Sequence, residues 1–300
     1  MMVYPVPRSW KAPALGLLAV ALTAAGRARP LPPDVPANLT QATAMRSEFG
    51  GAGGGAAAGP ADLGDPTGWA TLKGKVTVVG APPQPQAIAI SADTGVCAPG
   101  GKTVFSQKVV VGPGGGLKNA IVYLATEIPD DEKWINATAK IQPGEEQVLF
   151  DQKECVFLSH TLGMQAGQTL LVKNSDPVGH NTKIESKSNR PENFTVGAGG
   201  TATWETTVGE RAPFPVSCAI HPWMLAHIMV TPTGYFAVTD ENGEFTIPNL
   251  PAGVELEFRV WHEAAGQRIS DSASGVSRGK FKLKLEGDKD LPIQVDAGLL

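Results

Sequence analysis

Residues 214–230 read Phe-Pro-Val-Ser-Cys-Ala-Ile-His-Pro-Trp-Met-Leu-Ala-His-Ile-Met-Val. Two apolar runs, Phe214–Cys218 and Ala226–Val230, have the length and composition of strands, and a loop separates them. Within that loop a thiol, an imidazole and a thioether follow one another at three-residue intervals, at Cys218, His221 and Met224. The stretch therefore predicts a strand, a loop rich in possible metal ligands, and a second strand.

The same texture of short apolar runs and turns extends in both directions from this stretch. The chain has 300 residues, and its 35 glycines and 25 prolines make up a fifth of it, while 18% of the residues are charged against about a quarter in ordinary soluble domains. No window predicts an amphipathic helix of ten or more residues. We expect an all-β protein built from sandwiches, with strands near 71–79, Val104–Val111, Ala120–Ala125, Glu146–Phe150, Val156–Leu158, Thr169–Asn174 and Ala202–Thr207 in addition to the two above.

The segment after Pro232 repeats the pattern on a smaller scale. Tyr235–Val238 reads as a strand, Asp240–Gly243 as a tight turn and Glu244–Ile247 as the partner strand, which together predict a hairpin. Further strands are expected at Val254–Trp261, Lys280–Leu285 and Leu291–Val295. We expect residues 232–300 to form a small second module.

The first residues have the features of an export signal. Arg8 and Lys11 precede the apolar run Ala14–Ala25, and the small residues Gly26 and Ala28 follow it. The sequence thus predicts a signal peptide over 1–28 and a periplasmic or secreted protein, with an uncleaved anchor or an apolar tail as the alternatives. Residues 29–68, rich in proline, glycine and alanine, predict a disordered tether, and no integral membrane segment is expected once the signal is removed.

A second histidine precedes the cysteine loop by 38 residues. His180 lies in Asn174-Ser-Asp-Pro-Val-Gly-His180-Asn181, just past a predicted strand. One thiolate, two imidazoles and a weak axial thioether are the ligands of a mononuclear blue-copper site, because thiolate and thioether favour Cu(I) and imidazole suits both oxidation states. Zinc is the competing metal, and Cys218 as an inert buried thiol is the simplest alternative.

The Cys-x-x-His-x-x-Met loop and the upstream Asn-Ser-Asp…His-Asn element resemble those of amicyanin-like and plastocyanin-like cupredoxins. The likeness is best over residues 145–230, and residues 69–144 resemble the leading part of exported proteins that join a cupredoxin to a carboxypeptidase-regulatory-like module. This resemblance implies a cupredoxin-like Greek-key β-sandwich over 69–231, followed by a transthyretin/carboxypeptidase-regulatory-like β-sandwich over 232–300. It implies one type 1 copper held by His180, Cys218, His221 and Met224, and a side chain at Asn181 that ties the two ligand loops together.

The remaining cysteines and the neighbours of His221 complete the set of candidate residues. Cys97 and Cys155 are expected to form a disulfide, since spare cysteines in an exported protein usually pair, although two free thiols remain the alternative. Pro222 and Trp223 are expected to face outward as an apolar docking patch around the edge of His221, unless Trp223 packs inward and braces the loop. His227 is expected to be a structural or surface histidine. His160 and His262 lack a ligand-rich neighbourhood in the sequence and are not expected to bind metal, although either could support a ligand from behind.

These features together favour a one-electron carrier that acts with redox partner proteins and is not an enzyme. A multicopper oxidase needs more histidines than the three left over. The mild net charge of −4, without a long basic run, argues against nucleic acid as a partner. The alternatives are a copper delivery or storage protein, and a binding or adhesion protein with a vestigial metal site.

Overall fold

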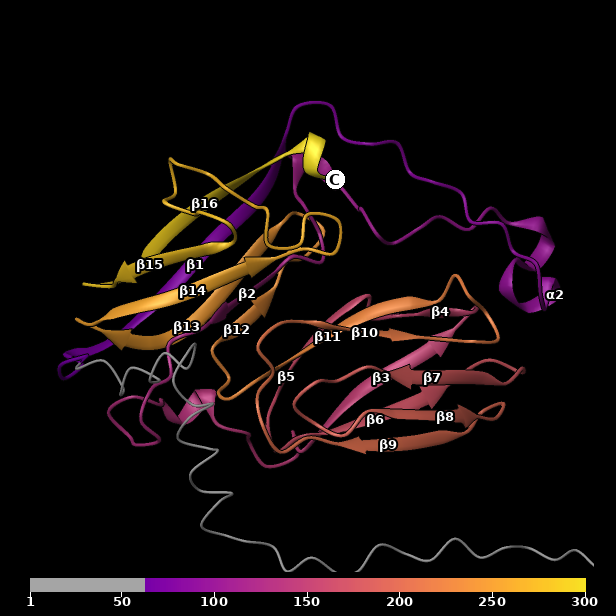
Figure 1. Cartoon of the computed structure of the whole chain (residues 1–300), viewed down its shortest axis with the longest axis horizontal. Coiled ribbons are helices and arrows are strands. Elements are labelled where there is room, and N and C mark those ends of the chain that lie inside the picture. Colours follow the sequence, from indigo (N-terminus) through magenta and orange to yellow (C-terminus); the bar gives the residue numbers. More distant parts are fainter. Residues whose placement is uncertain (1–62) are drawn as a thin grey trace, which may run out of the picture. The chain divides into compact units, whose positions relative to one another are not determined.

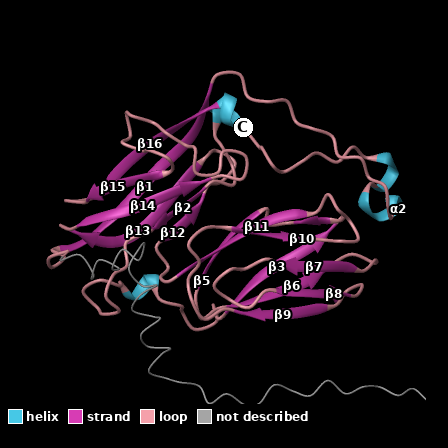
Figure 2. Cartoon of the chain, viewed as in Figure 1, coloured by secondary structure: helices cyan, strands magenta, loops and turns pink. Residues whose placement is uncertain are grey.

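Residues 63–300 are described by the computed structural model, and sixteen strands in them form four sheets (Figures 1 and 2). Helical segments in this part are short turns, so the all-β prediction is confirmed. The predicted signal peptide and nearly all of the predicted tether lie outside the described residues. Among the helices of residues 63–300, none is long and apolar enough to cross a membrane.

Two of the sheets enclose one hydrophobic core, and together they form what is called here the first sandwich. One sheet has the order β13-β1-β16 and the other the order β12-β2-β14-β15. Leu72, Ile247 and Ile293 from the first sheet meet Val122 and Phe258 from the second, and all five side chains are fully buried. The strands are β1 (Gly68–Val79), β2 (Ile121–Leu124), β12 (Phe236–Val238), β13 (Glu244–Ala252), β14 (Glu255–Trp261), β15 (Lys280–Lys284) and β16 (Lys289–Asp296).

Strand β1 lies in the centre of a sheet made from the C-terminal part of the chain. It pairs antiparallel with β13 and parallel with β16, and Gly74 stands opposite Leu291. A Cβ atom at Gly74 would lie 2.2 Å from the carbonyl oxygen of Leu291, so only glycine permits this close pairing. The predicted boundary at residue 231 therefore does not coincide with the division between the sheets, because β1 and β2 belong with residues 236–296.

The predicted hairpin around residue 241 forms its turn but not its strand pair. Gly243 N–H donates to the carbonyl of Asp240 (3.0 Å), as the tight turn requires. Strand β12 nevertheless pairs with β2, and β13 pairs with β1 in the other sheet, so the hairpin prediction is wrong. The reason is burial: Phe236 and Val238 of β12 pack between the sandwiches, whereas Phe245 and Ile247 of β13 fill the first core.

The other two sheets form the second sandwich, which carries the predicted ligands. Their orders are β5-β11-β10-β7-β8 and β4-β3-β6-β9, and Phe150, Val172, Val216 and Ile228 are fully buried between them. Strands β5, β7 and β8 were not expected from the sequence. The strands are β3 (Gln147–Lys153), β4 (Val156–Phe157), β5 (Thr161–Gln165), β6 (Thr169–Asn174), β7 (His180–Ile184), β8 (Glu192–Val196), β9 (Thr201–Glu205), β10 (Phe214–Ser217) and β11 (Leu225–Thr231).

The two sandwiches touch along β2, all four residues of which are buried. Val122 and Leu124 belong to the first core, while Ile121 and Tyr123 on the opposite face pack with Met229 of β11. A strand that is covered on both faces reads as a continuous apolar run, as Ile-Val-Tyr-Leu does. The second sandwich thus covers an outer face of the first.

Residues 80–116 form an arm that leaves β1, passes α2 (Thr94–Cys97) and η1 (Pro99–Gly101), and returns through η2 (Pro113–Gly115) to β2 (Figure 1). The predicted strand Val104–Val111 is absent: the arm makes isolated bridges and a few hydrogen bonds, such as Ile88 N–H to the carbonyl of Val104 (2.8 Å). Cys97 lies in the second core and forms a disulfide with Cys155. The disulfide thereby fastens the arm to the sandwich that holds the predicted ligands.

Candidate metal centre

The loop between β10 and β11 is closed by its own backbone. Cys218 N–H donates to the carbonyl of Met224 (3.2 Å), and Met224 N–H donates to the carbonyl of His221 (2.9 Å). These bonds turn the three-residue spacing of Cys218, His221 and Met224 into a compact loop. Met224 is 1% exposed and lies in the same core as Cys218.

His180 is brought to this loop by sheet pairing rather than by sequence proximity. It is the first residue of β7, and β7 pairs antiparallel with β10. Its Nδ1 lies 3.0 Å from His221 Nδ1, and Cys218 Sγ lies 3.9 Å from the same His221 atom. The donor atoms of His180, Cys218 and His221 all lie within 4.8 Å of one another, and none of the three residues is more than 3% exposed.

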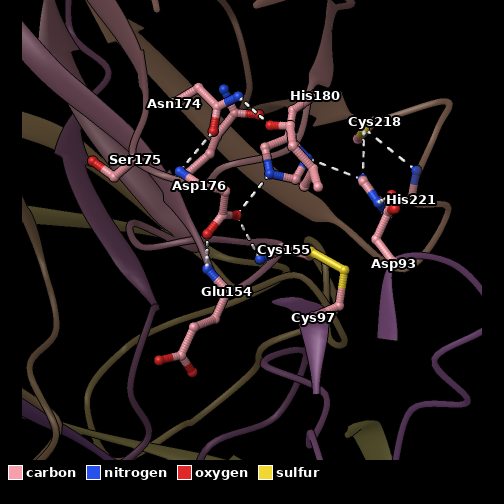
Figure 3. Close-up of polar contacts among 12 residues, drawn as sticks. Asp93, Cys97, Glu154, Cys155, Asn174, Ser175, Asp176, His180, Cys218 and His221 are labelled. Carbon is pink, nitrogen blue, oxygen red and sulfur yellow. Dashed lines mark hydrogen bonds and ion pairs between the residues drawn. A yellow bond between two sulfur atoms is a disulfide. The ribbon is translucent and has the colours of Figure 1, made fainter. Parts of the chain in front are cut away.

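Each imidazole is held from behind by a carboxylate (Figure 3). His180 Nε2 lies 2.7 Å from Asp176 Oδ2, and His221 Nε2 lies 2.9 Å from Asp93 Oδ2. A carboxylate only accepts, so each neutral ring carries its proton on Nε2 and presents an Nδ1 lone pair. Two lone pairs at 3.0 Å repel each other unless they share a proton or a metal ion, and the buried donor set fits a bound metal ion.

Cys218 is poised as a thiolate. Its sulfur accepts hydrogen bonds from the backbone N–H groups of Asn181 (3.3 Å) and His221 (3.4 Å). Burial alone would raise the pKa of the Cys218 thiol, but the neighbouring His180 ring and these N–H groups outweigh burial and lower the pKa to about 6. Burial would conversely lower the pKa of His180, yet Cys218 and Asp176 raise it. The thiolate is the form that binds soft metals.

Asp176, which the sequence analysis missed, joins this centre to a strained turn. Glu154 and Cys155, between β3 and β4, both have positive φ (52° and 54°), as a type I′ turn requires, although glycine or asparagine is usual there. The carboxylate of Asp176 accepts both of their N–H groups, at 2.7 and 2.9 Å, and it also holds His180. Its place in the Asn-Ser-Asp segment beside His180 was the available signal.

Asp93, also missed, reaches His221 from the arm. It has φ 46°, a left-handed conformation that aspartate tolerates better than most residues. It lies 128 positions from His221 in the chain, and its side chain is 42% exposed. The nearby disulfide fixes the arm, and one ring nitrogen of His221 lies within 4.8 Å of both of its sulfur atoms. No local sequence pattern marks such a contact.

The other candidate residues surround the loop as follows. Asn181 links the two ligand segments, because its Oδ1 accepts from Ala219 N–H (3.0 Å) while its own N–H reaches Cys218. Pro222 is exposed, but Trp223 is half-buried, lies 5.2 Å from His221 between ring centroids and donates from Nε1 to the carbonyl of Cys155 (3.0 Å). Trp223 thus braces the loop from inside, and the large exposed apolar side chain of the loop is Ile220, at 44%.

The three remaining histidines lie away from this centre and are buried together. His160, His227 and His262 are 8%, 9% and 1% exposed. Burial lowers the pKa of His227 and of His262 to about 4, against the opposing influence of Glu263, so both are neutral at neutral pH. Glu263 itself is ionised: burial would raise its pKa, but His160, His227 and Lys108 lower it on balance.

Comparisons with known proteins return structural matches alone. No family model matches the chain, and no curated protein sequence matches it. A copper-containing nitrite reductase from Thermus scotoductus SA-01 matches over 28% of this chain and 22% of its own, at 20% identity and a TM-score of 0.26. Amicyanin from Paracoccus versutus matches over 36% of this chain and 96% of its own, at 15% identity and a TM-score of 0.25. TM-scores this low do not establish a shared fold or function.

Proposed function

We propose that this chain is an exported type 1 copper protein that carries single electrons between redox partner proteins and catalyses no reaction of its own. One observation carries the proposal: a buried thiolate and two Nδ1 lone pairs converge within 4.8 Å, with both imidazoles oriented by carboxylates. Copper bound there would supply the Cu(I)/Cu(II) couple. Met224, buried in the same loop, would be its weak axial ligand.

The residues around the donors suit electron transfer because they hold the donors still. Asp176 and Asp93 fix the two rings, Asn181 ties the ligand segments together, and Trp223 fills the inside of the loop. A donor set that moves little between oxidation states keeps the reorganisation small. The donors are also too deeply buried to meet a substrate directly, whereas an electron can leave through the loop where Ile220 and Pro222 are exposed.

Copper is favoured over zinc by the donors available. The set combines one thiolate with two imidazoles, and its remaining neighbour is a thioether, which is a poor ligand for zinc but a common one for copper. The disulfide supports export, because disulfides form and persist in oxidising compartments. This agrees with the predicted signal peptide and with a periplasmic or secreted location.

The test is a visible spectrum recorded as Cu(II) is added to metal-free protein. We expect an intense thiolate-to-copper band that saturates at one copper per chain, and we expect Cys218→Ser to lose it. The matched control is Ala219→Ser, which adds a hydroxyl at the neighbouring exposed position and leaves the thiol in place; it should keep the band. An uncoloured copper complex of the wild-type chain would overturn the assignment, and preferential binding of zinc would favour a structural site.

Retention of the metal separates an electron carrier from a copper delivery protein. After reduction, the carrier should keep Cu(I) in the presence of a competing Cu(I) chelator of moderate affinity and regain its colour on reoxidation. A delivery protein would surrender the metal to the chelator. We expect the protein to retain Cu(I), since the carboxylates of Asp176 and Asp93 hold the two imidazole rings in place whatever the oxidation state of the copper.

A further inference from the structure

A second group of metal-binding side chains lies where the two sandwiches meet. His160 immediately precedes β5, His227 lies in β11, and Glu263 follows β14. The two histidines are tied together by the backbone, because His227 N–H donates to the carbonyl of His160 (2.8 Å). Glu263 arrives from the first sandwich, so donors from both sandwiches meet at one point.

The donor atoms of this group are close enough to share one ion. His160 Nε2 lies 2.5 Å from Glu263 Oε2, and His227 Nδ1 lies 3.8 Å from the same oxygen. All three donor atoms lie within 4.8 Å of one another. The side chains of His160, His227 and Glu263 are 8%, 11% and 10% exposed, so the three donors are largely buried.

One atom of this group has no hydrogen-bond partner among the described residues. His227 Nδ1 is buried without a bond, since 3.8 Å from Glu263 is too long for one. A buried polar atom in this state is destabilising, because it has given up its hydrogen bonds to water without replacing them. His227 Nδ1 lies on the side of the Glu263 carboxylate that His160 already contacts. An ion bound by His160 and Glu263 could therefore take His227 Nδ1 as its third ligand.

We propose that His160, His227 and Glu263 form a second metal site, distinct from the centre at Cys218, that binds a divalent transition metal such as Zn²⁺ across the two sandwiches. Two imidazoles and a carboxylate are a borderline donor set that suits Zn²⁺ and Cu²⁺. The set has no sulfur and therefore does not favour Cu(I). The site does not depend on the proposed electron-carrier function.

Two further groups face the site without joining it. His262 accepts a hydrogen bond at Nδ1 from Ala264 N–H (3.3 Å), and its buried Nε2 has no hydrogen-bond partner among the described residues, but His262 does not belong to the group of three donors that lie within 4.8 Å of one another. Lys108, on the arm, contributes a positive charge that acts on Glu263. The ion would bring His227 Nδ1 and Glu263 together and join the sandwiches, so its binding should raise the melting temperature.

The experiment follows the five histidine side chains by NMR while Zn²⁺ is added to the full chain, with single histidine variants for assignment. We expect a binding event that shifts the ring signals of His160 and His227 and leaves His262 little changed, whatever happens at His180 and His221. Unshifted His160 and His227 at saturating Zn²⁺ would overturn this proposal. The response of His180 and His221 to Zn²⁺ does not bear on it, because the first centre is proposed to prefer copper and is tested by its Cu(II) spectrum.

Glu263→Gln tests the carboxylate, and Glu257→Gln on β14 is the matched control, because Glu257 lies outside the group and contacts Arg259. Loss of a partner outside the ligand shell already weakens metal binding about 10–100-fold, so loss of a ligand should weaken it at least as much. We expect Glu263→Gln to lose affinity and the Zn²⁺-dependent rise in melting temperature, and the control to keep both. The site is refuted if Glu263→Gln binds Zn²⁺ with the affinity of the wild-type chain. If that variant fails to fold, the NMR titration of the wild-type chain decides, and His160 and His227 signals that do not shift with Zn²⁺ would refute the site.

Discussion

Asp176 carries the sharpest prediction, because one buried carboxylate holds both a strained turn and a candidate ligand. Its Oδ1 accepts from Glu154 N–H, and its Oδ2 accepts from Cys155 N–H and His180 Nε2. In Asp176→Asn one oxygen becomes an amide nitrogen that faces donors. At least one backbone N–H or the His180 ring therefore loses its acceptor, and the remaining hydrogen bonds are made to a neutral group instead of a charged one.

The magnitude follows from these contacts. A hydrogen bond to a charged group contributes about 1.5–3 kcal/mol, and a neutral one about 1 kcal/mol. Losing one such bond and weakening the others should lower the free energy of unfolding by about 3 kcal/mol. With a urea slope of about 3 kcal/mol/M, the unfolding midpoint of the metal-free, disulfide-bonded protein should fall by about 1 M.

The assay compares Asp176→Asn with Glu185→Gln in parallel urea titrations. Glu185 is an exposed carboxylate whose ion pair with Lys183 (2.6 Å) lies on the surface, so its loss should change the free energy of unfolding by less than about 1 kcal/mol. If both variants shift the midpoint equally little, the carboxylate of Asp176 does not hold the turn, and the reasoning about His180 falls with it.

Three further outcomes are expected. Replacing both Cys97 and Cys155 by serine removes a disulfide between residues 58 positions apart, and by loop entropy this should lower the free energy of unfolding by about 4 kcal/mol, measured by denaturation. A decrease of less than about 1 kcal/mol would contradict the prediction. In metal-free protein the Cys218 thiolate should titrate near pH 6, seen as thiolate absorbance missing from Cys218→Ser. Because the pKa of Cys218 in the folded protein lies below its ordinary value of 9.0, the stabilisation from this group is complete above pH 9 and is lost as the pH falls through 6; a titration midpoint near 9 would contradict it. Met224→Leu should keep the visible band and raise the reduction potential, and a lowered potential would count against axial ligation.

The compact loop that carries Cys218, His221 and Met224 could be predicted from the sequence because the interactions that close it are local. Hydrogen bonds within seven residues bring Cys218, His221 and Met224 together. His180 was expected from the resemblance of its segment, whereas the strand β7 that carries it to β10 was not expected. Asp93 could not be predicted in the same way. It reaches His221 only because a disulfide holds an otherwise irregular arm in place, and neither the arm's path nor its left-handed Asp93 leaves a periodic pattern.

The sequence also does not predict which strands pair where a tight turn joins two strands that pack in different cores. The Asp240–Gly243 turn was read correctly, but a turn does not decide which sheet each flanking strand enters. The strand near Val104 was expected from composition alone and lacks a continuous partner. The alternating residues of β1 predict a strand, but they do not predict its partners, because β13 and β16 lie about two hundred residues further along the chain.

The pairing of β1 with β16 also sets an order of assembly. Everything from β3 to β11 lies between two adjacent strands of the first sandwich, β2 and β12, and can form its sheets from a continuous stretch of chain. The first sandwich must wait, because β1 gains its parallel neighbour only when residues 289–296 have emerged. As the chain leaves a ribosome or a translocation pore, β1 therefore stays unpaired on one side until β16 follows. A truncation that removes β16 would leave this edge of β1 open to pairing with other chains.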